Sequence, residues 1–148
     1  MLTRRGFLAG SAAVLAVRAQ TPPLERPIRA AVFSEPGFPS VDIAPLGREA
    51  LASALSGFEV AWVSETELAD LRHFDILITP YGSTSPKAAW KPILEYLRQG
   101  GNWVNLGGVP FSVPVVRDNG EWRQEVRQTA YHKALFITQS FATARRCW

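Results

Sequence analysis

The chain has 148 residues, 47% of them hydrophobic, which is enough for one domain with a buried core. Its net charge of +3 comes from residues 1–19, which hold three arginines and no acidic residue, so the remaining Lys and Arg balance the 13 Asp and Glu. A neutral domain lacks the basic surface that nucleic-acid binding requires, and we expect no nucleic-acid partner. The single cysteine, Cys147, excludes a disulfide within this sequence.

The first 19 residues have the features of an export signal. Residues Thr3–Leu8 (TRRGFL) are similar to the twin-arginine pattern, an apolar run follows, and residues 17–19 (VRA) form an acceptable cleavage site. The apolar run is shorter than the ~20 residues of a membrane helix, so we expect no stable membrane span. We predict a signal peptide over residues 1–19, recognition of Arg4 and Arg5 by the twin-arginine export machinery, and a periplasmic or secreted protein. An uncleaved amphipathic N-terminus is the alternative.

Strands and helices alternate along the next part of the chain. Residues 20–27 contain three prolines and predict a linker. Short apolar runs predict four strands, over Ile28–Phe33, Phe58–Val63, Phe74–Thr79 and Trp103–Leu106. The first helix is expected to be capped by Asp42 or Ala44, and a short helix is expected over Thr66–Arg72. This alternation predicts an α/β fold, a flavodoxin-like three-layer sandwich with a parallel sheet of order 2-1-3-4.

Residues 74–108 are the best-defined unit, a strand, a helix and a second strand that lies parallel to the first. Ser85 is expected to be the helix N-cap and Pro86 the first helical residue. Apolar residues then recur at helical spacing, and Gly100–Gly101 ends the helix. Pro92 conflicts with a helix that begins at Pro86, so we expect either a kink or a helix that begins near Lys91.

The character of the sequence changes after this unit. Phe111–Arg117 and Glu121–Arg127 flank Asp118-Asn119-Gly120, which predicts a β-hairpin, and Pro114 predicts that the first arm is an edge strand. Parallel sheets of this class usually have five or more strands. We therefore predict an α/β domain over residues 28–111, followed over 112–148 by a hairpin and an incomplete tail, and we expect the sequence to be a fragment of a longer protein.

Three segments carry a resemblance to a known family: DILITPYG, EYLRQGG and NWVNLGGVPF, within residues 28–111. The chain resembles the class I glutamine amidotransferase-like superfamily. It is most similar to the non-amidotransferase branch, the β-galactosidase trimerisation-like domains of bacterial glycoside hydrolases. Catalytic members have a cysteine at the turn after the strand that corresponds to Trp103–Leu106. The turn here, Leu106–Val109 (LGGV), has none, so the resemblance implies a domain that does not release ammonia from glutamine.

Ligands of open α/β sheets bind beyond the carboxyl ends of the strands. The residues at these ends are our candidate ligand-binding residues: Glu35, Tyr81, Gly82, Ser83, Gly107 and Gly108. Glu35 and Asp42 can form a carboxylate pair for glycoside chemistry, but we favour a capping Asp42 and a solvated Glu35. Residues 82–85 can bind an anion before a helix, but they lack the phosphate-loop pattern, and capping is favoured.

The remaining candidate residues give no chemistry. His73 and His132 have no metal-ligand spacing around them, so we expect no metal, no cofactor and no catalytic residue. His73 is expected at the surface, and His132 can line a groove. Trp90 and Trp103 fit core positions, whereas Trp122, beside the hairpin turn, is the better candidate for an exposed contact.

These observations favour an exported, non-catalytic domain that acts as an accessory or interaction module of a larger carbohydrate-active protein. A carbohydrate ligand and a homo-oligomer are the candidate partners. Two alternatives remain open. The chain can belong to a glycoside hydrolase, or be a small hydrolase acting on carbohydrate, with any glycoside hydrolase activity expected in a missing domain. It can also be a stand-alone sugar-binding module.

Overall fold

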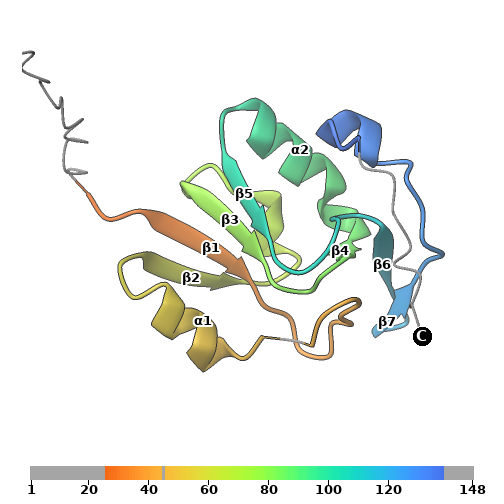
Figure 1. Ribbon diagram of the computed structural model, residues 1–148, viewed down its shortest axis with the longest axis horizontal. Helices are drawn as coiled ribbons and strands as arrows, with labels where there is room; N and C mark the ends of the chain where they lie inside the picture. Colours follow the sequence, from red (N-terminus) through yellow and green to blue (C-terminus); the bar gives the residue numbers. More distant parts are fainter. Residues whose placement is uncertain (1–25, 45, 139–148) are drawn as a thin grey trace, which may run out of the picture.

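The computed structural model describes residues 26–44 and 46–138 (Figure 1). The predicted signal peptide, Cys147 and most of the linker lie outside these residues. The strands are β1 (Arg29–Phe33), β2 (Glu59–Val63), β3 (Ile76–Thr79), β4 (Thr84–Pro86), β5 (Asn102–Asn105), β6 (Val113–Asp118) and β7 (Glu121–Gln124). The helices are α1 (Arg48–Ala54) and α2 (Trp90–Arg98), with single 3₁₀ turns η1 (Glu67–Ala69), η2 (Lys87–Ala89) and η3 (His132–Leu135).

The main sheet has four parallel strands in the order β2-β1-β3-β5. Ile78 lies opposite Val104, and β1 is paired on both sides. The predicted order, with the fourth predicted strand as β5, is therefore confirmed, as is the parallel pairing of the strands around α2. β1, β2 and β3 are short and rich in apolar residues, which is typical of a parallel sheet that is covered by helices.

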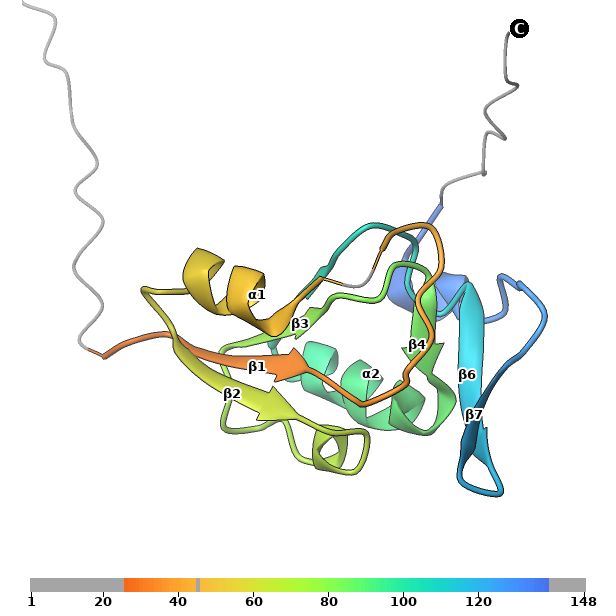
Figure 2. The same ribbon diagram turned by 90° about the horizontal axis from the view of Figure 1, so that it is seen from below.

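The two faces of the main sheet are covered by different helices. Figure 2 shows α1 on one side of the sheet and α2 on the other. On the α1 face, Leu51 packs with Val32 and Ile78, and on the α2 face, Ile93 packs with Leu77. Because α1 has only seven residues, it leaves part of its face uncovered, and the side chain of Val104 in β5 is 40% exposed there. The described chain is thus an α/β sandwich with one incompletely covered face.

A second sheet contains β4, β6 and β7, in the order β4-β6-β7. β6 and β7 form the predicted hairpin, and both turn residues, Asn119 and Gly120, have positive φ (50° and 87°), as a two-residue hairpin turn requires. The prediction that Pro114 marks an edge strand is wrong, because β6 is the central strand. Pro114 lies one residue before Val115–Asp118, the part of β6 that pairs with β7, so its missing N–H leaves those pairs intact, and its carbonyl still accepts from the N–H of Glu125 at 2.8 Å.

The predicted cap of the second helix is wrong. Ser85 and Pro86 belong to β4, which pairs in parallel with β6, and the Ser85 hydroxyl accepts a hydrogen bond from the N–H of Phe111 at 3.0 Å. α2 begins only at Trp90, so Pro92 lies in its first turn, where backbone N–H groups have no acceptor within the helix. Of the two expectations for Pro92, the later helix start is the one that the structure has.

Two further helix predictions need correction. α1 begins after Gly47, which makes no side-chain cap, so neither Asp42 nor Ala44 caps it. The helix expected over Thr66–Arg72 is reduced to the single turn η1, whose Leu68 is fully buried. In the part of the chain that the structure describes, no helix has the length and apolarity that crossing a membrane would require.

Candidate functional site

The six candidate residues follow the carboxyl ends of β1, β3 and β5, as predicted, but the segment that contains Glu35 lies against the others. The segment after β1, residues 34–44, crosses the ends of these strands. Val41 forms a parallel bridge with Gly82, in which the N–H of Ser83 donates to the carbonyl of Val41 at 3.2 Å. The N–H of Val41 donates to the carbonyl of Tyr81 at 3.4 Å. We call residues 34–44 the covering segment.

The glycines at this edge make room for the covering segment. Gly82 has a φ of +69°, and a Cβ atom there would overlap the carbonyl oxygen of Val41. Gly107 has a φ of +84°, and its Cβ would overlap the side chain of Ile43. Gly108 lies directly against Ser83. The pattern of glycines at strand ends, which favours a ligand site in the sequence, is therefore used for close contact within the chain.

Ser83 is the centre of a polar cluster at this edge. Its hydroxyl donates to the carboxylate of Asp42, accepts from the N–H of Val109 at 3.3 Å and lies 3.5 Å from a guanidinium nitrogen of Arg127. Arg127 also forms an ion pair with Asp42 at 3.0 Å. Asp42 holds a φ of 77°, which is uncommon for a residue with a side chain. Asp42 therefore fastens the covering segment and caps no helix.

Glu35 is held by a second, separate set of partners. Its carboxylate accepts from the N–H of Glu65 at 2.9 Å and pairs with Arg117 at 3.2 Å, and its side chain is only 11% exposed. The expectation of a solvated Glu35 is wrong. Burial raises the pKa of Glu65, an effect that Arg117 opposes and Glu35 reinforces. The hydroxyl of Tyr81 accepts from the N–H of Glu35 at 3.1 Å.

Glu35 and Asp42, which were considered as a carboxylate pair and not favoured, thus have different partners: Arg117 for Glu35 and Arg127 for Asp42. Both arginines come from the C-terminal part of the chain, more than 80 residues after their acidic partners. Sequence reasoning placed Glu35 at the correct edge, favoured a helix cap for Asp42 and missed both arginines. No local pattern in a single sequence links residues so far apart.

Trp122 is not the exposed contact that was predicted. Its ring lies 5.0 Å from that of Phe38, the guanidinium of Arg117 lies 4.4 Å above it, and its indole N–H donates to the carbonyl of Pro36 at 3.2 Å. The side chain is half-buried and joins the hairpin to the covering segment. Trp90 pairs with the buried ring of Phe111, in keeping with its predicted place in the core.

Trp103 also packs against the core, and its indole N–H donates to Thr79 at 2.9 Å. His132 is buried, with a ring nitrogen 3.2 Å from the hydroxyl of Ser112, and its burial lowers its pKa. It also lines an open cavity of about 570 Å³, in keeping with the expected groove, together with Thr129, Lys133, Phe136, Ile137 and Thr138. His73 is exposed, as predicted. Within residues 26–44 and 46–138, no three His, Cys, Asp or Glu side chains are grouped so that they could hold a metal ion.

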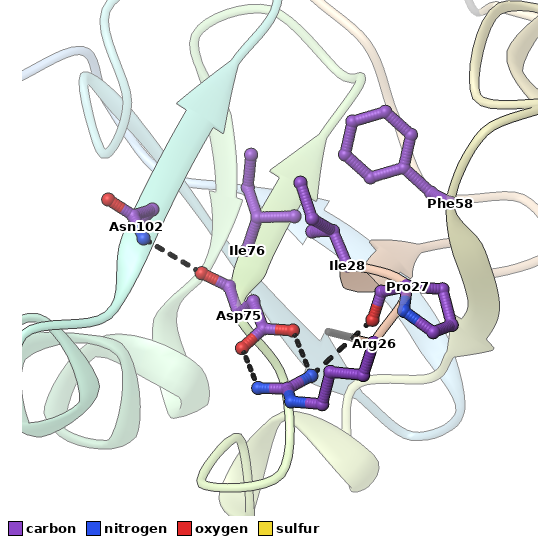
Figure 3. Close-up of a pocket in the computed structure, with 7 residues that line it drawn as sticks. All are labelled: Arg26, Pro27, Ile28, Phe58, Asp75, Ile76 and Asn102. Atoms are coloured by element: carbon purple, nitrogen blue, oxygen red, sulfur yellow. Dashed lines mark hydrogen bonds and ion pairs between the residues drawn. The ribbon is translucent and has the colours of Figure 1, made fainter. Parts of the chain in front are cut away.

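An apolar cavity of about 380 Å³ opens at the amino ends of the strands of the main sheet, the end opposite to the candidate residues (Figure 3). It is lined by Arg26, Pro27, Ile28, Phe58, Asp75, Ile76 and Asn102, so none of the six candidate residues belongs to it. Arg26 and Asp75 form a bidentate ion pair, in which two guanidinium nitrogens lie 2.6 and 2.7 Å from the two carboxylate oxygens. Hydrogen bonds from Arg26 and from the N–H of Arg29 lower the pKa of Asp75 to about 2.

This cavity lies on the face of the sheet that α1 covers incompletely, and sequence reasoning missed it because it assumed that both faces are covered. The side-chain amide of Asn102 donates to the carbonyl of Asp75 at 2.9 Å, which ties the first residue of β5 to the residue that precedes β3. The cavity is lined mainly by apolar side chains, and its one carboxylate, Asp75, is bound to Arg26. The lining therefore offers no nucleophile and no general base.

Comparison with known proteins found no family model, no curated protein and no solved structure that matches the chain.

Proposed function

We propose that the chain is an exported, non-catalytic domain of the class I glutamine amidotransferase-like type, with a flavodoxin-like sheet, and that it serves as an accessory or interaction module of a larger carbohydrate-active protein. Two features support the family. The parallel order β2-β1-β3-β5 is that of flavodoxin-like sheets. The turn after β5, Leu106–Val109, has the glycines that the resemblance requires.

The covering segment is the observation that carries the non-catalytic role. In open α/β sheets the reacting groups lie in a crevice beyond the strand ends. Here the covering segment lies against that edge, and the polar side chains there are bound to one another. Ser83 is buried and donates to Asp42, and an activated serine needs a base such as histidine. The buried His132 contacts Ser112 instead.

Enzyme assays test the absence of catalysis. The protein that begins at Gln20 would be incubated with a panel of aryl glycosides and followed by release of the aryl alcohol. We expect no turnover, and no difference between the unchanged protein and the variants Glu35→Gln and Glu121→Gln, the second being an exposed control in the hairpin. Hydrolysis that is abolished by Glu35→Gln and unaffected by Glu121→Gln would show that the domain is an enzyme.

The accessory role has a separate test in the gene. Reading the genomic DNA beyond the codon for Trp148 should reveal a domain with the paired carboxylates of a glycoside hydrolase. If the neighbouring sequence encodes no carbohydrate-active domain, the accessory role is wrong. Calorimetric titration with a panel of oligosaccharides then distinguishes a sugar-binding module, which releases or absorbs heat on binding, from a module that binds only protein.

Export is tested with the leader itself. Residues 1–19 would be fused to a reporter that the twin-arginine route carries in its folded state, and Arg4 and Arg5 would both be replaced by Lys. We expect the reporter to reach the periplasm with the natural leader and to stay in the cytoplasm with the variant. Equal distribution of the two reporters would contradict the twin-arginine assignment.

A further inference from the structure

β5 forms one edge of the main sheet, and half of its backbone groups have no partner among the described residues. The N–H of Leu106 donates to the carbonyl of Thr79 at 3.0 Å, and the carbonyl of Leu106 accepts from the N–H of Gly82 at 3.0 Å. The backbone of Leu106 therefore faces β3. Because direction alternates along a strand, the N–H and C=O groups of Trp103 and Asn105 face away from β3. No described residue binds these four groups.

The two edges of the main sheet differ in charge. The other edge strand, β2, begins with Glu59, which lies 3.7 Å from Arg29, and Arg48 lies over the ring of its Trp62. Charged side chains of this kind protect an edge from pairing with another chain. β5 (NWVN) has no charged residue. Its Val104 is 40% exposed, on the face of the sheet that α1 covers incompletely.

We propose that β5 pairs with β5 of a second copy of this chain, in antiparallel orientation and about a two-fold axis at Val104. In this register Val104 lies opposite the partner's Val104, and Trp103 lies opposite the partner's Asn105. The outward N–H and C=O groups of Trp103 and Asn105 then form an inter-chain ladder, and the two main sheets become one.

Symmetry is the reason for choosing a second copy as the partner. A two-fold axis places the residue on the axis opposite its own equivalent and pairs the rest of the strand with the same strand of the other copy, so an edge with charge of one sign repels its copy and a neutral edge does not. β5 is neutral, and its exposed side chain at the axis is apolar. The pairing also covers the side chain of Val104, which β3 and α1 leave partly exposed to solvent. This inference does not depend on the proposed role in carbohydrate metabolism.

Sedimentation equilibrium of the full chain tests the proposal, over concentrations from about 1 to several hundred µM. We expect a dimer. Val104→Lys places two ammonium groups at the axis and should weaken dimerisation at least about 100-fold, since like charges opposed at an interface cost several kcal/mol. The matched control is Ala52→Lys, which adds the same charge to an exposed position of α1 and should leave the dimer unchanged. Circular dichroism would verify that both variants fold.

Cross-linking tests the register. In a Cys147→Ser background, Val104→Cys should form a dimer disulfide under mild oxidation, because opposite residues of a non-hydrogen-bonded pair lie about 4.5 Å apart at Cα. Ala52→Cys should not. A monomer at every concentration, as expected if residues 139–148 or another segment of this chain occupy the edge, would overturn the proposal. A dimer that tolerates Val104→Lys and gives no Val104→Cys cross-link would also overturn it.

Discussion

Replacement of Gly82 by alanine is the most direct test of the contact between the covering segment and the strand ends. Gly82 has a φ of +69°, and a Cβ atom would overlap the carbonyl oxygen of Val41. The substitution therefore has two effects that can be separated. It forces a side chain into a left-handed backbone conformation, and it pushes the covering segment away from Tyr81 and Ser83.

The cost follows from the contacts that are lost. The left-handed conformation costs about 1–2 kcal/mol for a residue with a Cβ atom. Displacement of Val41 breaks two backbone hydrogen bonds, to Tyr81 and from Ser83, each worth about 1 kcal/mol. Gly82→Ala should thus lower the free energy of unfolding by about 3–4 kcal/mol, a large part of the roughly 5–15 kcal/mol of a typical domain.

Gly120 provides the control. Its φ is +87°, yet a Cβ atom there would meet nothing within 4 Å, so Gly120→Ala carries the backbone strain without the displacement. Urea unfolding of the two variants, followed by tryptophan fluorescence, should show Gly82→Ala to be less stable than Gly120→Ala by about 2 kcal/mol. Equal losses would mean that the covering segment does not pack on Gly82, and the non-catalytic assignment would lose its main support.

Three further predictions concern other contacts. Gly107→Ala should destabilise the protein, and Ile43→Ala should recover part of the loss, with a coupling of about 1 kcal/mol in a double-mutant cycle of urea unfolding. Asp75 has a pKa of about 2 in the folded protein, below its ordinary 3.8, so its stabilising effect is complete above about pH 4 and is lost as the pH falls toward 2; Asp75→Asn should flatten the acid side of a plot of melting temperature against pH. Tyr96→Phe should cost about 1–2 kcal/mol in urea unfolding, because the phenol accepts from the N–H of Asn102 at 3.2 Å.

Each of these predictions has an outcome that contradicts it. Strictly additive losses for Gly107→Ala and Ile43→Ala would show that the two residues do not touch. If the plots of melting temperature against pH run parallel for wild-type and Asp75→Asn between pH 5 and 2, the ion pair of the Asp75 carboxylate does not stabilise the folded protein. Unchanged stability of Tyr96→Phe would indicate that water replaces the phenol.

The strands of the main sheet were predictable because their signals are local. An apolar run between turn residues specifies a buried strand, and the short connections through helices impose the parallel order. The start of α2 was not predictable in the same way. Ser85 and Pro86 have the residue types of a helix start, but pairing with β6, about 30 residues later, determines their conformation.

The candidate site was predictable in position and not in content. The rule for strand ends correctly brought Tyr81, Ser83 and Gly107 to one edge. The rule does not say whether solvent, a ligand or the chain itself lies beyond that edge. This depends on Arg117 and Arg127 reaching back to Glu35 and Asp42, and such pairings leave no trace in the spacing of a single sequence.

The ion pairs from the hairpin to the covering segment also set the order of events during synthesis. Glu35 and Asp42 emerge from the ribosome first, and Arg117 and Arg127 emerge only after more than 80 further residues have been added. Contacts between such distant residues form slowly, since a long loop must close first. On the proposed export route, which carries folded proteins, the rate at which the hairpin docks would limit how soon a newly made molecule can leave the cytoplasm.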